Sequence, residues 1–377
     1  MDVEHESAVS GRVRETSLRG PGAPAGRREA TNRPGRTPLP FRRQPFQAAW
    51  WVPGPHGQTL AARWLRRRLR FSFRRERIET PDGDFLDLDE AAPAPTRALG
   101  RSDGHEAAPM ALLLHGLEGC SGSGYVLATC AALAERGIRA VAMNFRSRSG
   151  EPNRRPDSYH AGRTDDLAFV LGRLAARRPG APLGAIGFSL GGNVLLKYLG
   201  QTGDDAPEEL RAAVAISVPF DLSSSARALE RGLGRLYGSY FLRSLKRGVR
   251  AKATLFPQAL DSRRASAART LREFDDAVTA PVHGFRSAAD YYARASCAAD
   301  IGAIRVPTLL LQSSDDPLVP WGSWPEAAVR ENPWLVDGRT AKGGHVGFVS
   351  GTLPWRPVFW AEREASRFLA AHLPAGP

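Results

Sequence analysis

Six short apolar runs recur along this 377-residue chain, and stretches with helical spacing of apolar residues separate several of them. The runs comprise residues 110–114, 139–145, 183–188, 212–217, 308–312 and 334–336. The early runs are almost continuously apolar, as in parallel strands that helices cover on both faces. Residues 125–136, 164–177, 191–199 and 358–369 are expected to be helices. Strands alternating with helices predict an α/β fold with a mostly parallel central sheet and helices on both faces.

Two segments depart from this alternation. Residues 75–90 form two alternating runs joined by Pro81-Asp82-Gly83, which is typical of a β-hairpin. Between about residues 221 and 297, apolar residues such as Leu229, Leu233 and Leu236 recur at helical spacing without a strand. This segment is expected to be a helical cap insertion, with two compatible roles: extra core packing, or a lid over the ligand-binding edge of the sheet.

The positive charge lies at one end of the chain. Residues 1–78 hold 17 arginines and 6 acidic residues, so they carry +11 of the total net charge of +13. Residues 1–44, rich in Arg, Pro and Gly, are predicted to be a disordered leader before a domain at 45–377. The basic run at residues 63–77 suits a basic groove or a membrane-facing helix, or a solvated helix face in a chain with 48 Arg and only 4 Lys. Weak membrane-surface contact through this basic segment stays open, whereas no nucleic-acid partner is expected because the rest of the chain is almost neutral.

Several other functional classes find little support in the sequence. Cys120, Cys130 and Cys297 have neither zinc-site spacing nor the number needed for a disulfide framework, so no metal or other cofactor is expected. No apolar stretch is long enough for a signal peptide or a membrane span, and a cytoplasmic location is therefore expected. The glycine-rich loop at 116–124 lacks the sequence of a P-loop and the third glycine of a dinucleotide fingerprint.

A serine lies between glycines where a predicted strand meets a predicted helix. The pentapeptide Gly187-Phe188-Ser189-Leu190-Gly191 matches the G-x-S-x-G pattern of a nucleophile elbow. This turn requires a strained serine backbone, and a Cβ at either flanking glycine would collide with neighbouring backbone. Ser189 is therefore the predicted nucleophile.

Two further polar residues follow later predicted strands. Asp316 lies in the segment Ser314–Pro320 after the strand at 308–312, and Asp315 is its rival as the acid that would orient a histidine. His345 lies in the glycine-rich segment GGHVGF, from which it could act as a general base. The chain order Ser189, Asp316, His345 is that of α/β-hydrolases.

The end of the first parallel strand supplies a candidate oxyanion hole. The sequence LLLHGL at residues 112–117 places His115-Gly116 where such enzymes bind a developing oxyanion with backbone N–H groups. The two predicted donors are the amides of Leu117 and Leu190, and His115 itself is expected to be structural.

Seven separated motifs together resemble one family. In order they are HGLEGCSGSGY, NFRSRSGEPN, SYHAGRTDDL, GFSLGGNVLLKYLG, FDDAVTAPVHGF, YYARAS and GGHVGF, and the likeness runs from about residue 45 to 373. This set is similar to the YheT-like branch of the α/β-hydrolase superfamily. The resemblance implies a triad at Ser189, Asp316 and His345 and activity on carboxylic or lipid esters. Ser147 departs from the pattern, which usually has glycine there; Arg146, Tyr159 and His160 fit family positions and are expected to be scaffold residues.

These observations predict a serine hydrolase that cleaves small-molecule esters with a hydrophobic acyl group through an acyl-enzyme. Acyl transfer to an alcohol would use the same residues. A non-catalytic binding protein with this fold, and nucleic-acid binding through the basic leader, are alternatives from other classes. Oligomeric state is not predicted.

Overall fold

An eight-stranded sheet forms the core of the chain that this computed structural model describes, residues 40–66, 71–91 and 108–374. The strands run in the spatial order β1-β2-β4-β3-β5-β6-β7-β8. From β4 to β8 all neighbours are parallel, whereas β2 is antiparallel to β4 and β1 to β2. The predicted, mostly parallel α/β sheet is confirmed. The strands are β1 (Phe73–Glu79), β2 (Phe85–Ala91), β3 (Met110–Leu114), β4 (Arg139–Asn144), β5 (Leu183–Phe188), β6 (Leu210–Ile216), β7 (Thr308–Ser313) and β8 (Leu335–Thr340).

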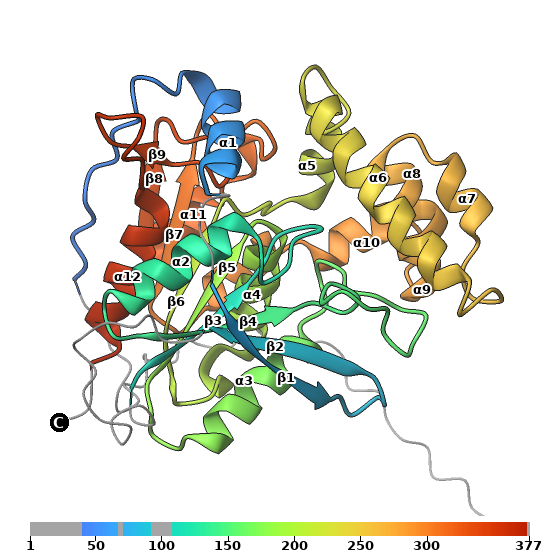
Figure 1. The fold of residues 1–377 in the computed structure, drawn as a ribbon, viewed down its shortest axis with the longest axis horizontal. Coiled ribbons are helices and arrows are strands. Elements are labelled where there is room, and N and C mark those ends of the chain that lie inside the picture. The colour runs from blue at the N-terminus through green and yellow to red at the C-terminus, as the bar shows by residue number, and fades with distance from the viewer. Residues whose placement is uncertain (1–39, 67–70, 92–107, 375–377) are drawn as a thin grey trace, which may run out of the picture. The chain divides into compact units, whose positions relative to one another are not determined.

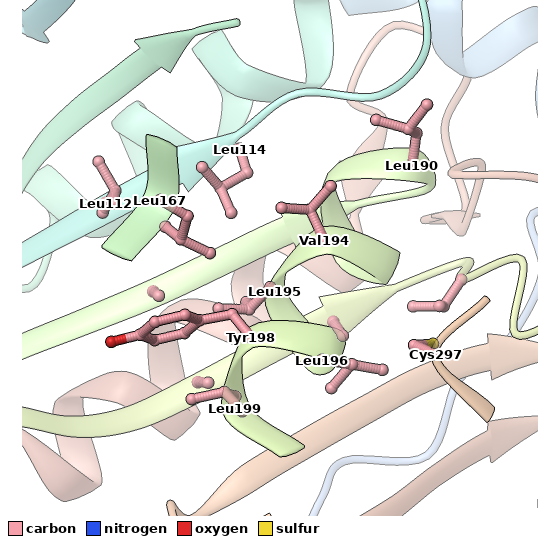
Figure 2. Close-up of a cluster of buried hydrophobic side chains, with 14 of the residues drawn as sticks. Leu112, Leu114, Leu167, Leu190, Val194, Leu195, Leu196, Tyr198, Leu199 and Cys297 are labelled. Carbon is pink, nitrogen blue, oxygen red and sulfur yellow. The ribbon is translucent and has the colours of Figure 1, made fainter. Parts of the chain in front are cut away.

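Helices cover both faces of this sheet, as expected. Side chains alternate along a strand, and in β3 Leu112 and Leu114 pack with α3 (Asp165–Arg177) and α4 (Leu190–Thr202). Ala111 and Leu113 pack on the other face, with α2 (Gly124–Ala134) and α12 (Trp360–His372). Figure 2 shows the first of these clusters, in which the leucines of β3 face Val194 and its neighbours on α4. Burial on both faces explains why β3 is apolar at every position.

The expected helical insertion is present between β6 and β7. It contains α5 (Leu222–Ala228), α6 (Gly234–Ala253), α7 (Ser262–Ala267), α8 (Leu271–Phe274), a π-helical turn at Asp275–Thr279, α9 (Ala280–Val282) and α10 (Ala288–Ala295). Helices α6 to α9 gather beside one another in Figure 1, in yellow and orange. They share a small apolar core that includes Leu242, Val249, Leu260 and Phe274. We refer to residues 221–297 as the cap.

The basic run at 63–77 is not one helix, so the expectation of a single helix over these residues was wrong. Helix α1 (Gly54–Leu65) ends near its start, and β1 begins at Phe73. Arg75 and Arg77 lie across the predicted hairpin from Asp89 and Asp87, with which they form ion pairs at 2.7 and 2.8 Å. Cross-strand pairing with acidic residues thus accounts for part of the positive charge.

Residues just before the predicted domain boundary at 45 make contacts with the domain. The ring of Phe41 packs edge-on against Phe368 at 5.0 Å, and Arg43 donates a 2.7 Å hydrogen bond to the carbonyl of Arg339. Residues 1–39, most of the predicted leader, lie outside the described residues, and the prediction that they are disordered stays a prediction. The last elements are α11 (Glu326–Glu331), β9 (Val349–Ser350) and β10 (Val358–Phe359); because β10 takes the first two residues, the helix predicted from 358 begins at Trp360.

Candidate active site

Ser189 occupies a sharp turn between β5 and α4. Its φ is +50° and its ψ is −118°, a backbone conformation that residues other than glycine rarely adopt. A Cβ on Gly187 would lie 2.5 Å from the carbonyl oxygen of Gly191, and a Cβ on Gly191 would lie 2.5 Å from that of Leu114. Both flanking glycines are therefore required by backbone contacts, as the sequence pattern predicted.

The three residues of the predicted triad lie together. The Nε2 atom of His345 is 3.0 Å from Oγ of Ser189, and its Nδ1 atom is 2.8 Å from Oδ2 of Asp316. The three residues follow β5, β7 and β8, whose carboxyl ends lie at one edge of a parallel sheet. A hydrogen-bonded chain thus links carboxylate, imidazole and hydroxyl.

Asp315 and Asp316 have different partners, which separates the two rivals. The second carboxylate oxygen of Asp316, Oδ1, accepts hydrogen bonds from the amides of Leu318 and Val319 at 2.8 and 3.0 Å. Asp315 accepts a 2.9 Å hydrogen bond from the amide of Gly344 and so supports the histidine loop from its backbone side. Only Asp316 of the two contacts the imidazole.

Residues that the sequence analysis did not single out hold the histidine loop. The amide of His345 donates to Oγ1 of Thr59 on α1 at 2.9 Å, and that of Val346 donates to Oγ of Ser217 at 2.9 Å. The buried Arg66 donates to the carbonyl of Val346 at 2.8 Å and pairs at 2.5 Å with the equally buried Glu362. Thr59 and Ser217 lie far from the motifs, and no local pattern marks them.

The residues of the two predicted oxyanion donors, Leu117 and Leu190, line the same pocket as Ser189. The amides of Gly116 and Glu118 donate to the hydroxyls of Tyr125 and Tyr159 at 2.9 and 2.8 Å. Within the described part of the chain, the intervening amide of Leu117 has no acceptor. The amide of Leu190, the first residue of α4, also has none there, which is usual for the first turn of a helix. Two unused N–H groups therefore flank Ser189.

His115 and Tyr159 make contacts that support the turn at residues 116–118. Burial lowers the pKa of His115 to about 3, so its ring is neutral. Its Nδ1 is 2.8 Å from the carbonyl of Gly116, and its Nε2 accepts from the amide of Phe145 at 3.2 Å. Tyr159 stacks on Phe145 and donates to Glu118 at 2.9 Å. These contacts are those of scaffold residues.

The remaining motif residues surround the site without meeting Ser189. Arg146 is buried and pairs with Asp84 at 3.0 Å and with Asp166 at 2.6 Å. Ser147 has a φ of +63°, so it adopts the left-handed conformation that glycine takes most easily. His160 lines the space under the cap, and burial together with neighbouring His283 lowers its pKa to about 3.

Two pockets open on Ser189. One, of about 130 Å³, lies under the cap and is lined largely by apolar side chains, among them Leu222, Leu229 and Leu271. The other, of about 480 Å³, lies between α1 and the turn at 116–124. We call them the cap pocket and the α1 pocket. An ester whose carbonyl carbon lies at Ser189 could place its acyl part in one pocket and its alcohol part in the other.

Two absences hold for the residues that the structure describes. No group of three or more His, Cys, Asp or Glu residues there has an arrangement that could hold a metal ion. No helix among them is both long enough and apolar enough to span a bilayer. All three cysteines are free; Cys130 and Cys297 are buried, and burial raises the pKa of Cys130 to about 12.

Known proteins are similar to this chain in sequence and in fold. The α/β-hydrolase-fold family model matches residues 111–352. The chain is 37% identical over 322 residues to "Putative esterase YheT" of Escherichia coli (strain K12), covering 85% of this chain and 91% of that protein. It is 33% identical over 335 residues to "Phospholipase ABHD3" of Mus musculus, covering 86% and 78%.

A solved structure adds evidence for the fold alone. A puromycin-hydrolysing peptidase of Mycobacterium tuberculosis superimposes with a TM-score of 0.50 at 19% identity, over 79% of this chain and 38% of that one. Family model, sequence relatives and sheet topology agree, and the chain belongs to the α/β-hydrolase family, in its YheT-like branch.

Proposed function

We propose that this protein is a serine hydrolase that cleaves carboxylic esters through an acyl-enzyme. The observation that carries the proposal is the hydrogen-bonded chain Ser189–His345–Asp316, with distances of 3.0 and 2.8 Å, beside two unused backbone amides. Its relatives named esterase and phospholipase support the same class of reaction.

In the first half of the proposed reaction, Ser189 attacks the ester carbonyl. His345 takes the hydroxyl proton at Nε2 while Asp316 accepts from Nδ1–H and stabilises the imidazolium that forms. The amides of Leu117 and Leu190 donate to the oxyanion, and each such donor is typically worth about 10²–10³ in rate. When the intermediate collapses, His345 gives the proton to the departing alcohol and Ser189 keeps the acyl group.

In the second half, water replaces the alcohol. His345 now removes a proton from water as it attacks the acyl-enzyme, and returns that proton to Ser189 as the acid leaves. The cap pocket, with its apolar lining, is the proposed site of the acyl chain.

A cytoplasmic location stays a prediction, as does weak membrane contact through the basic segment.

Kinetics on a series of p-nitrophenyl esters tests this function. We expect turnover of the butyrate ester, and a loss of at least about 10⁴-fold in kcat in a folded Ser189→Ala variant. Glycerol added as acceptor separates hydrolysis, which gives mainly butyric acid, from acyl transfer, which gives mainly butyrylglycerol. Absence of both products with folded wild-type protein would contradict the proposal and favour a binding protein.

A further inference from the structure

The two pockets at Ser189 differ in chemistry. The side chain of Phe241, on α6, lines both and so lies at the boundary between them. The cap pocket is mainly apolar, whereas polar side chains line the α1 pocket, including Thr59, Arg63, Tyr125 and Tyr240. With the acyl chain in the cap pocket, the alcohol part of an ester would occupy the α1 pocket.

One charge in the α1 pocket has no counter-charge. Arg66 pairs with Glu362, and Glu118 pairs with Arg148 at 3.0 Å, so these groups are neutralised as pairs. Arg63 lines the same pocket, and no carboxylate within ion-pair distance of it exists in the described ranges 40–66, 71–91 and 108–374. The exposed Arg63 therefore adds an uncompensated positive charge to the lining of the pocket that also contains Ser189.

Contacts with the cap orient the guanidinium of Arg63. It donates a 2.7 Å hydrogen bond to the hydroxyl of Tyr240 and lies over the Tyr240 ring at 4.5 Å from its centroid. A guanidinium has five N–H donors, and in the described structure this is the one hydrogen bond that the Arg63 side chain makes. The other donors are available to a ligand, and a planar guanidinium suits the paired oxygens of a carboxylate or phosphate.

Helix α1 places Arg63 on the helix face that contacts the histidine loop. Thr59 accepts the hydrogen bond from the backbone amide of His345, and Arg63 lies four residues later on the same helix. Residues four apart lie on one helix face. A second link, between His56 on α1 and the Tyr237 hydroxyl on α6 at 3.1 Å, holds the two helices together.

We infer that the preferred substrates are esters whose alcohol part carries an oxyanion, a carboxylate or a phosphate, which Arg63 binds in the α1 pocket. This inference deepens the proposed function and rests on it. Arg63 selects the leaving group, and Tyr240 is a positioning residue that holds the guanidinium toward the pocket. The cap pocket would then bind the acyl end of a substrate, and Arg63 would bind its alcohol end.

Two matched pairs of esters test the inference. The carboxylate pair is 4-butyryloxybenzoate and its neutral methyl ester, and the phosphate pair is 1-butyrylglycerol 3-phosphate and neutral 1-butyrylglycerol. In each pair the readout is the ratio of kcat/KM for the anionic ester to that for the neutral ester. We expect Arg63→Gln to lower this ratio about tenfold in at least one pair, and the pair with the larger loss identifies the oxyanion. Arg63→Lys, which keeps the positive charge, should retain part of the wild-type preference for the anionic ester.

Arg250→Gln is the matched control. Arg250 is exposed on α6, ten residues beyond Tyr240, which is on the order of 15 Å along a helix. That distance exceeds the Debye length of about 8 Å at physiological salt, so the control should leave both ratios unchanged. If Arg63→Gln leaves both ratios at the wild-type values, or Arg250→Gln lowers them equally, the inference is wrong. Failure of wild-type protein to hydrolyse either neutral ester would instead contradict the proposed function.

Discussion

Ser189 combines a strained backbone with close support from its neighbours. Gly187 allows strand β5 and helix α4 to approach within distances that a Cβ would prevent, and Gly191 does the same for α4 and the end of β3. The strain is maintained because the surrounding packing leaves the turn no alternative, as is common for residues in sparsely populated conformations at functional sites. The same packing fixes where Oγ points relative to His345.

The acid of the proposed triad gives a sharp prediction at this scale. In Asp316→Asn an amide nitrogen can replace Oδ2, which faces His345, and such a group cannot accept from Nδ1–H. The imidazole would then favour the wrong tautomer, and we expect kcat on p-nitrophenyl butyrate to fall by about 10³–10⁴-fold.

Asp315→Asn is the matched control for that change. Its remaining oxygen can still accept from the amide of Gly344, so kcat should stay within about twofold of wild type. Equal losses in the two variants would mean that Asp316 has no special role. The choice between these neighbours needed coordinates, because adjacent carboxylates in one turn look alike in a sequence.

Among the elements, helix α6 contributes side chains to both pockets of the site. Phe241 on this helix lines both pockets, and its removal would join them. We expect Phe241→Ala to raise kcat/KM for p-nitrophenyl decanoate relative to the butyrate several-fold, because a longer acyl chain gains room. The ratio of the two values across the ester series is the measurement.

Leu255→Ala serves as the comparison for the Phe241 variant. Leu255 is exposed just beyond the end of α6 and lines neither pocket, so its variant should keep the wild-type chain-length profile. An unchanged profile in Phe241→Ala would show that this side chain does not limit the acyl site.

The elements also differ in how well the sequence predicted them. β3 and β5 begin and end where expected, because continuous burial makes them apolar at every position. Helix α1 was missed: its sequence GPHGQTLAARWL begins with proline and two glycines, which are poor helix formers. Tertiary contacts, including the hydrogen bond from His345 to Thr59, hold it in place.

At the scale of the whole molecule, buried histidines connect stability to pH. Burial lowers the pKa of His115 and His160 to about 3 and that of His283 to about 4, whereas unfolded histidine titrates near 6.5. Below pH 6.5 the unfolded chain therefore binds protons that the folded chain does not. The free energy of unfolding should fall as the pH falls, by at most about 1.4 kcal/mol per pH unit for each histidine.

Asp275 opposes this trend in part of the range. Burial raises its pKa to about 6, so between about pH 6 and 4 the folded chain holds a proton that the unfolded chain releases. Urea unfolding at pH 6.5, 6 and 5 measures the net slope. We expect His115→Gln, which still offers a donor and an acceptor to its neighbours, to reduce the slope by about one proton. The same slope as wild type would contradict the assignment of a neutral His115.

The sequence predicted those site residues that lie in local patterns, but not the residues that reach the site only through long-range contacts. Ser189, Asp316 and His345 each stand in a recognisable local pattern after a strand, and a parallel sheet brings such positions to one edge. The supporting residues Thr59 and Ser217 stand in no pattern. Thr59 reaches the histidine loop only because α1 packs on the domain, and Ser217 contacts this loop only through the fold. Their roles became visible only through distances.

Reaction with a fluorophosphonate probe, followed by mass spectrometry of the intact and digested protein, tests the central claim most directly. An activated serine should take up one phosphonyl group, located on Ser189, and folded Ser189→Ala should take up none. Folded wild-type protein that stays unlabelled, or a Ser189→Ala variant labelled to the same extent, would contradict the account.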